Sequence, residues 1–232
     1  SQNSASPVSC RSGRTVTPLN HLSPPSRPEM RVTIGVAGGS NSGKTTIAGN
    51  HIGVEPDGSP GVSSQSEGVL VLSSGNLIGG VDPADRNLIS GNANAGIWLA
   101  GAAASLNLIR GNFIGTDPTG TIAVPNGSGG VWISGVDNTV GGTDVTDRNL
   151  ISGNGRGVLV YLSSAVGNEI QGNWIGTDVT GTLPLPNESG IPFDPAGIAV
   201  QQGAIDTLIG GTTAGAGNLI ASNDPTGVFV AG

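Results

Sequence analysis

Residues 38–45 contain the pattern that nucleotide chemistry requires of a phosphate-binding loop. They read Gly-Gly-Ser-Asn-Ser-Gly-Lys-Thr and follow a β-branched run from Val32 to Val36. Such a loop binds phosphates when its backbone amides face the ligand at the start of a helix. Residues 46–53, however, align with residues 108–115 as a strand and turn of an internal repeat, and glycine also serves solenoids at their corners. We therefore predict a turn, no nucleotide site and no helix beginning at Lys44.

A second motif repeats an aspartate of the kind that binds metal ions. The loop Gly-Thr-Asp-x-Thr-Gly-Thr occurs at residues 115–121 and 176–182 and, weakly, at 53–58. It suits a turn in which the carboxylate accepts backbone amides two or three residues ahead. Calcium takes six to eight oxygen ligands, so one carboxylate per loop makes a poor calcium site. We expect Asp117 and Asp178 to hold turns, keep them as weak metal candidates, and expect no cofactor.

The pairs Asp85-Arg86 and Asp147-Arg148 place an acid beside a base. In a repeat fold they would lie in alternate coils, two strand spacings or about 10 Å apart. A lyase or hydrolase needs an acid and a base, or a basic residue near metal-bound substrate, on one face. We expect these pairs to be surface ion pairs or turn caps, which stabilise weakly. His51 is expected to be exposed and non-catalytic, so no catalytic residue is predicted.

The elements that must position these residues belong to an internal repeat. Its clearest copy is Asn-Leu-Ile-Ser-Gly-Asn at residues 87–92, and six copies indicate a repeat architecture. In each copy Asn and the Ile two residues later share one face of a strand, while a bulky residue faces the other way. Stacked Asn amides can hydrogen-bond along a buried ladder. The predicted structural ladder is Asn50, Asn87, Asn112, Asn149, Asn173 and Asn218, beside an internal column of Ile52, Ile89, Ile114, Ile151, Ile175 and Ile220.

Two further strands complete each turn of the repeat. A first strand recurs seven times between residues 32 and 230, and a second is centred on Ile47, Ile78, Ile109, Val140, Ile170 and Ile209. Like residues then stack about 4.8 Å apart. We predict an all-β fold, a right-handed three-sheet parallel β-helix (β-solenoid) of about six and a half coils. The coils span residues 31–67, 68–95, 96–129, 130–156, 157–196 and 197–226, and their alternating lengths make a pair of coils the deeper unit.

Residues 1–30 lack this periodicity. They are rich in Ser and Pro, so we expect an irregular arm, linker or cap before a β-helix domain of residues 31–232.

Three motifs give the chain a resemblance to a known family. They are Asn-x-Ile-x-Gly-Asn, Asn-x-Ile-Gly-Gly and Gly-Thr-Asp-x-Thr-Gly-Thr, and they extend over the repeat region. The chain thereby resembles the right-handed parallel β-helix repeat family of the pectate-lyase-like superfamily. That resemblance implies the fold, but the superfamily includes polysaccharide lyases, hydrolases, adhesins and surface proteins, so it implies no single activity. The paired Asp, Gly-His-Gly and Arg-x-Lys sets of polygalacturonases find no match here.

Two rows of outward strand positions are unexpectedly apolar. Alternation predicts polar residues facing water. The first-sheet row is Thr33, Leu70, Trp98, Trp132, Leu159, Ala199 and Phe229, and the third-sheet row is His51, Leu88, Phe113, Leu150, Trp174 and Leu219. We interpret both rows as exposed interaction stripes, since large apolar patches mark contact surfaces. Cover by the chain's own loops, lateral self-association and an aromatic platform for sugar rings remain open alternatives.

Composition excludes several classes of protein. The formal charge of −7, with nine Lys plus Arg, argues against nucleic-acid binding. No apolar run approaches the roughly 18 residues of a membrane span. Cys10 is the lone cysteine, so no internal disulfide can form, and the first residues contain neither Met nor a signal-peptide hydrophobic region.

We expect a non-enzymatic structural or interaction module of an extracellular or cell-surface repeat protein. It would self-associate laterally or end to end, or bind another surface protein. The alternative is a carbohydrate-binding or polysaccharide-cleaving β-helix protein that stacks sugars on Trp98 and Trp132.

Overall fold

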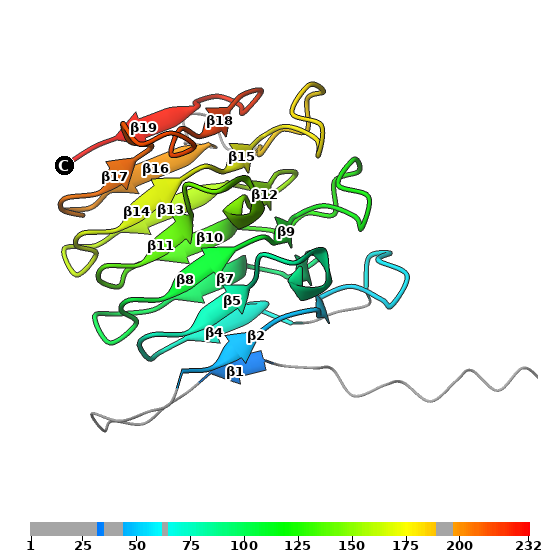
Figure 1. Cartoon of the computed structure of the whole chain (residues 1–232), viewed down its shortest axis with the longest axis horizontal. Coiled ribbons are helices and arrows are strands. Elements are labelled where there is room, and N and C mark those ends of the chain that lie inside the picture. Colours follow the sequence, from blue (N-terminus) through cyan, green and yellow to red (C-terminus); the bar gives the residue numbers. More distant parts are fainter. Residues whose placement is uncertain (1–31, 35–43, 62–64, 189–196) are drawn as a thin grey trace, which may run out of the picture.

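The fold is a three-sided parallel β-helix, as the repeat predicts (Figure 1). The computed structural model describes residues 32–34, 44–61, 65–188 and 197–232. The predicted arm of residues 1–30 and most of the glycine-rich loop at 38–45 lie outside the described residues. Within the described ranges the chain consists of short strands, turns and two 3-10 helices, and no α-helix is present.

Three sheets run along the axis, and every strand pairs in parallel with its counterparts in the adjacent coils. The first sheet contains β1 (Val32–Ile34), β4 (Val69–Val71), β7 (Ala95–Leu99), β10 (Gly129–Ile133), β13 (Val158–Tyr161), β16 (Ile198–Gln201) and β19 (Val228–Val230). The second contains β2 (Thr46–Ile47), β5 (Leu77–Gly79), β8 (Leu108–Arg110), β11 (Thr139–Gly141), β14 (Glu169–Gln171) and β17 (Leu208–Ile209). The third contains β3 (His51–Ile52), β6 (Leu88–Ile89), β9 (Phe113–Ile114), β12 (Leu150–Ile151), β15 (Trp174–Ile175) and β18 (Leu219–Ile220).

The predicted column of isoleucines on the third sheet is confirmed. Each Ile pairs in register with the Ile of the next coil, from Ile52 through to Ile220. Ile89, Ile114 and Ile151 are completely buried, and the column joins aliphatic residues of the other two sheets in one core. Because burying an aliphatic side chain stabilises a fold by about 1.5–3 kcal/mol, the core favours the stacking of every coil on the next.

Asparagine side chains form three ladders at the corners of the coil. Along each ladder the side-chain amide of one Asn donates to Oδ1 of the Asn in the next coil, at 2.7–3.1 Å. One ladder consists of the six asparagines at the start of the third strand. A second precedes the second strand and contains Asn76, Asn107, Asn138 and Asn168. The third follows the third strand and contains Asn92, Asn126, Asn154, Asn187 and Asn223.

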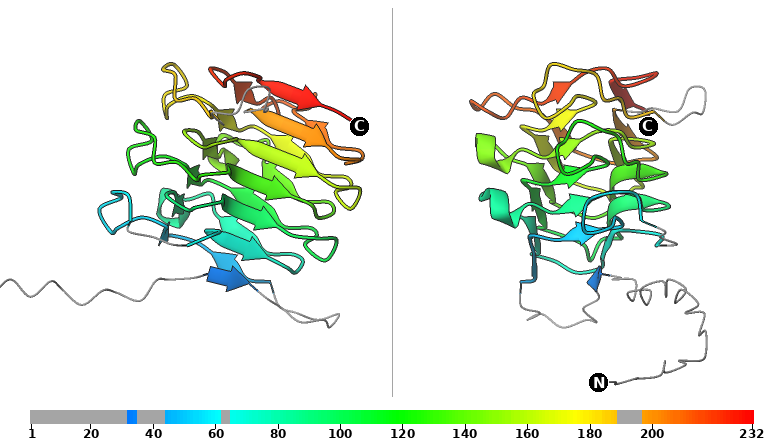
Figure 2. Two further views of the ribbon diagram at one scale, coloured as in Figure 1. Left: turned by 180° about the vertical axis from the view of Figure 1, so that it is seen from behind. Right: turned by 90° about the vertical axis from the view of Figure 1, so that its right-hand side faces the viewer.

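Successive coils carry two kinds of insertion, so the pair of coils is the repeating unit. The first, third and fifth coils carry hairpin loops closed by antiparallel bridges, Val54 with Pro60, Thr116 with Ala123 and Thr177 with Pro184. These loops project one above another on the same side (Figures 1 and 2). The second and fourth coils instead carry the 3-10 helices η1 (Pro83–Asp85) and η2 (Val145–Asp147).

Candidate binding groove

The third-sheet row is not the exposed stripe that alternation predicts. Leu88, Phe113 and Leu150 are only 3%, 7% and 2% exposed and form a second small core, against which Trp174 packs. The hairpin loops cover them: a Cβ added at Gly120 would meet Val179, Leu150 and Phe113 at 2.8–3.0 Å. The expectation of exposure is therefore wrong for these three residues, because the hairpin loops fold back over the outer face of the third sheet.

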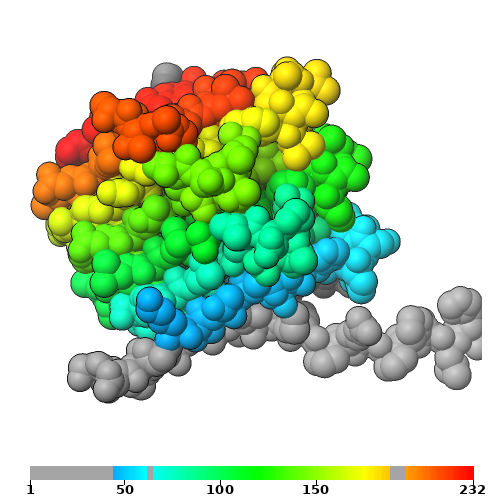
Figure 3. All heavy atoms as spheres, viewed as in Figure 1, coloured from blue at the N-terminus to red at the C-terminus, as the bar shows by residue number. Residues whose placement is uncertain are grey.

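A groove remains on this face between the two 3-10 turns. Figure 3 shows the segments around η1 and η2 as two prominences on one side of the molecule. The groove has a volume of about 320 Å³. Val81 and Val145 on its walls are 42% and 67% exposed, so the groove is accessible from solvent. Its lining consists of Gly80, Val81, Asp82, Pro83, Arg86, Gly111, Phe113, Val145, Thr146, Arg148, Leu150, Trp174 and Val179.

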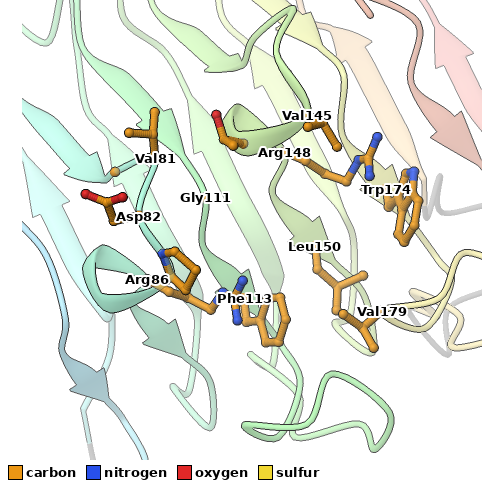
Figure 4. Close-up of a pocket in the computed structure, with 13 residues that line it drawn as sticks. Val81, Asp82, Arg86, Gly111, Phe113, Val145, Arg148, Leu150, Trp174 and Val179 are labelled. Atoms are coloured by element: carbon orange, nitrogen blue, oxygen red, sulfur yellow. The ribbon is translucent and has the colours of Figure 1, made fainter.

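Two arginines in this groove lie on aromatic rings of the adjacent coil. The guanidinium carbon of Arg86 is 4.1 Å from the ring centroid of Phe113, and that of Arg148 is 4.1 Å from that of Trp174. Figure 4 shows the two pairs, with Leu150 between them. A guanidinium over a ring face is attracted by the ring quadrupole, which contributes about 0.5–1 kcal/mol at exposed sites.

The backbone position before the third-sheet ladder creates the gap between the arginines. It is occupied by Arg86 and Arg148 in the second and fourth coils, and by Gly111 in the third coil between them. A Cβ at Gly111 would clash with the carbonyl oxygen of Gly80, and its φ of +68° also favours glycine. The third coil therefore adds no side chain here, and the turns of its neighbours stand as walls.

Local hydrogen bonds fix the η2 turn, which forms one wall of the groove. Asp144 caps η2 by accepting the Thr146 amide at 2.9 Å, and the Asp147 carboxylate accepts the Asp144 amide in return. Asp147 also forms an ion pair with Arg110 at 3.1 Å. The predicted cap at this turn is present, but the ion pair joins Asp147 to an arginine of another coil rather than to its neighbour Arg148.

The groove arginines lack an acidic partner among the described residues. No hydrogen bond or ion pair joins the Arg86 side chain to another described residue, and Arg148 donates only to the Gly172 carbonyl, at 3.4 Å. Partial burial lowers the pKa of both guanidiniums, with no carboxylate to offset it. Arginine nevertheless stays protonated in proteins. The groove therefore presents two positively charged guanidiniums, and most of their N–H groups are free to donate to a ligand.

The aspartates of the hairpin loops hold their turns. Asp117 accepts the amides of Thr121 and Ile122 at 3.0 and 2.9 Å. Asp178 makes the equivalent bonds in the fifth coil, at 3.2 and 3.1 Å. These amides lie four and five residues ahead, since each carboxylate spans the whole hairpin. The backbone amides of Thr119 and Thr180, two residues ahead as predicted, also bond to Asp117 and Asp178. The described ranges contain no group of three or more His, Cys, Asp or Glu that could hold a metal ion.

These bonds predict a loss of stability in acid. Burial raises the pKa of Asp117, but the Thr119 hydroxyl and the amides of Ile122 and Thr121 outweigh it, so the net pKa is lowered; Asp178 behaves alike. A lowered pKa gives stability that is present above the unfolded pKa of about 3.9 and lost as pH falls through the folded value. An Asp117→Asn/Asp178→Asn variant should have a lower free energy of unfolding than the native chain at pH 7. This difference in the free energy of unfolding should shrink below about pH 4.

Thermal unfolding between pH 2.5 and 7 tests this expectation. An Asp206→Asn control removes an acid whose carboxylate makes no hydrogen bond within the described part of the chain. A stability difference that stays constant with pH would contradict the assignment.

The first-sheet row is partly enclosed. Leu159 and Ala199 are 5% and 1% exposed, so exposure is also wrong for them, whereas Trp98 and Trp132 are half-buried. Trp132 packs edge to face against both Trp98 and Tyr161, with ring centroids 6.1 Å apart in each pair. Such pairs stabilise by about 0.5–1.5 kcal/mol beyond their burial. Leu70 and Phe229 are also half-buried, as is Trp174 of the third-sheet row, with Leu219 beside it.

The strands at residues 46–52 support the turn prediction for the glycine-rich segment. Thr46–Ile47 and His51–Ile52 are strands of the second and third sheets, so no helix begins at Lys44. His51 is exposed on the outer face, as predicted.

Arg86 and Arg148 are the residues whose role sequence reasoning missed. The sequence contained a sign of this role, because each arginine directly precedes an Asn of the third-sheet ladder. In the next coil the outward position of the third sheet is aromatic, Phe113 after Arg86 and Trp174 after Arg148. No protein-family model, curated protein or solved structure matches the chain. No helix in the described ranges is both long enough and apolar enough to cross a membrane.

Proposed function

We propose that the chain is a non-enzymatic structural or interaction module of an extracellular or cell-surface repeat protein. The observation that carries the proposal is the use of its polar side chains to build the coil. Asp117 and Asp178 close hairpins, Asp144 caps η2, and Asp147 pairs with Arg110. The motifs that resemble the pectate-lyase-like superfamily agree with this proposal, since surface proteins share that fold with enzymes.

The mechanism of such a module is mechanical rigidity. Asn ladders and aliphatic columns link every coil to the next. The hairpin loops of the third and fifth coils also bond to each other, since the Val179 amide donates to the Gly120 carbonyl at 2.9 Å. In a solenoid, stability is the sum of the coils and their nearest-neighbour interfaces. A rigid body with loops at regular intervals can present several contact surfaces at fixed spacing.

Head-to-tail contact between copies would join the two ends of the ladders in the described residues. Each ladder Asn donates toward the later coil, so the Asn218 backbone N–H has no acceptor and the Asn50 Oδ1 no donor among the described residues. The Asn218 side-chain amide donates to the Ile170 carbonyl at 2.7 Å. One end therefore offers donors and the other acceptors. The strand β19 has a partner on one side only, and Val228 and Val230 on it are 44% and 72% exposed. Unpaired strand edges are templates for association.

Sedimentation velocity across a wide range of chain concentration, with electron microscopy, tests self-association. We expect concentration-dependent assemblies of the native chain that a Val228→Lys/Val230→Lys variant loses. The matched control, Ile122→Lys/Leu183→Lys, charges two side chains that are 62% and 61% exposed on the hairpin loops. A native chain that stays monomeric at all concentrations and forms no filaments would count against self-assembly.

Carbohydrate binding is the second candidate function. It is favoured by the row of Trp98, Trp132 and Tyr161, whose side chains are half-buried and so remain partly accessible. Aromatic side chains with a partly accessible surface can stack on sugar rings. A screen of acidic and neutral polysaccharides should then show binding that Trp98→Ala and Trp132→Ala reduce and Trp174→Ala does not. If all three variants bind the polysaccharide equally well, this row is not the sugar-binding surface.

A further inference from the structure

We propose that the groove between the η1 and η2 turns binds a peptide segment in the polyproline II conformation with acidic residues three positions apart. This inference rests on the proposed interaction module and names the class of partner that its groove takes. Of the groove-lining residues only Arg86, Arg148 and Asp82 are charged, so the lining carries a net positive charge on a chain of net charge −7.

The two arginines of the groove are suited to bind carboxylates. A guanidinium offers a planar fork of donors that matches a carboxylate, and stacking on a ring fixes the plane of that fork. The Arg86 side chain makes no hydrogen bond or ion pair in the described chain, so its fork is available to a ligand. The acids around the groove limit the charge that it can accept. Asp82 lies on the rim and Asp144 caps the adjacent turn, which favours one carboxylate per arginine over multiply charged groups.

The spacing of the two arginines matches the polyproline II conformation. Arg86 and Arg148 occupy equivalent positions two coils apart, with Gly111 between them, so their Cα atoms are separated by two strand spacings, about 10 Å. A polyproline II helix has three residues per turn and rises about 3.1 Å per residue, which places positions i and i+3 on one side, about 9 Å apart. An extended strand would instead point these two side chains to opposite faces.

The walls and floor of the groove are largely apolar. Val81, Pro83 and Val145 are exposed and apolar, and Leu150 and the edges of the rings form the floor. Grooves with apolar and aromatic walls take proline-rich segments because these lose little conformational entropy on binding. Two prolines between two glutamates combine the apolar body with the charges at the required distance.

The test is a titration of the full chain with a blocked peptide that contains Glu-Pro-Pro-Glu flanked by glycines. Trp174 lies under Arg148, so its fluorescence reports occupancy, and calorimetry gives the affinity. Arg86→Gln and Arg148→Gln should each weaken binding about tenfold, as expected for the loss of a charge-assisted hydrogen bond. The control Arg156→Gln, which removes a positive charge outside the groove, should leave the affinity unchanged. Asp82→Asn should strengthen binding.

A second pair of variants leaves both arginine stacks in place. Val145→Glu puts a negative charge on an exposed groove wall and should weaken binding, whereas Ile205→Glu, at a site 48% exposed outside the groove lining, should not. Two further probes test the ligand: a peptide with adjacent glutamates and one with glutamines in their place should both bind about tenfold more weakly.

Three outcomes would overturn the inference. They are the absence of saturable binding, equal affinity for the peptides with spaced and adjacent glutamates, and undiminished binding by the arginine variants. Arginine-dependent binding of a uronate oligosaccharide or of inorganic phosphate, without binding of the peptide, would overturn the assignment to a peptide. Sedimentation measures self-association separately, so failure of the groove and failure of the proposed module are distinguishable.

Discussion

Replacing Gly141 by alanine is expected to lower the free energy of unfolding by more than about 4 kcal/mol, which few single substitutions do. Gly141 ends β11 with a φ of +87°, where a side chain costs about 1–2 kcal/mol. The new Cβ would also clash with the backbone carbonyl oxygen of Gln171 and lie 2.7 and 2.8 Å from the side-chain amide of Asn173. Because that carbonyl belongs to the paired strand β14, it cannot move aside without separating two coils.

A second glycine with a positive φ serves as a control, because it separates the cost of backbone strain from the cost of the clash between coils. Gly101 has a φ of +74°, yet nothing lies within 4 Å of a Cβ placed on it. Gly101→Ala should therefore cost only the backbone strain of about 1–2 kcal/mol. Urea denaturation of the two variants, followed by far-UV circular dichroism, compares them directly. Equal shifts in the denaturation midpoint would mean that backbone strain, rather than the contact between coils, sets the cost at Gly141.

The fold could be predicted from the sequence because its interior repeats in type as well as in period. Ile89, Ile114 and Ile151 stack at one position of successive coils, and a side-chain period of two fixes which residues face inward. A shift by one residue would bring Leu150 into the core and expel Ile151. The strand register therefore followed from the motif alone.

The third Asn ladder could not be predicted in the same way. Asn126 and Asn187 follow hairpin loops, while Asn92 and Asn154 follow the third strand directly, so their spacing from the preceding motif differs. The Asn126 amide nevertheless donates to the Asn154 Oδ1 at 2.9 Å. Only the folded loops bring these residues into one column.

The outer face was harder to predict than the core. Alternation identifies the side of the sheet on which Phe113 lies, but it does not show that Arg86 and the residues around Gly120 return to cover that side. Cover depends on loop conformation, which has no period. For the same reason the groove could not be derived from the sequence, although Arg86, Gly111 and Arg148 occupy one repeat position.

Replacing Asn149 by alanine should destabilise the chain by about 3–5 kcal/mol, because it leaves several buried polar groups without partners. The Asn149 side chain donates to the Ile109 carbonyl and to the Asn173 Oδ1, both at 2.9 Å. Its Oδ1 accepts the backbone and side-chain amides of Asn112, both at 3.0 Å. Each unsatisfied buried group costs about 1–3 kcal/mol, and alanine satisfies none of them.

The position of a residue in the ladder should set the size of this effect. Asn218 lies at the end of the same ladder, is half-buried, and accepts from Asn173 without an Asn beyond it, so water can replace its bonds. Asn218→Ala should therefore cost only about 1 kcal/mol, comparable to a typical exposed hydrogen bond. Urea denaturation of both variants measures the difference. Equal costs would show that each asparagine acts through its own coil, and that the hydrogen bonds between coils do not stabilise the solenoid as a continuous ladder.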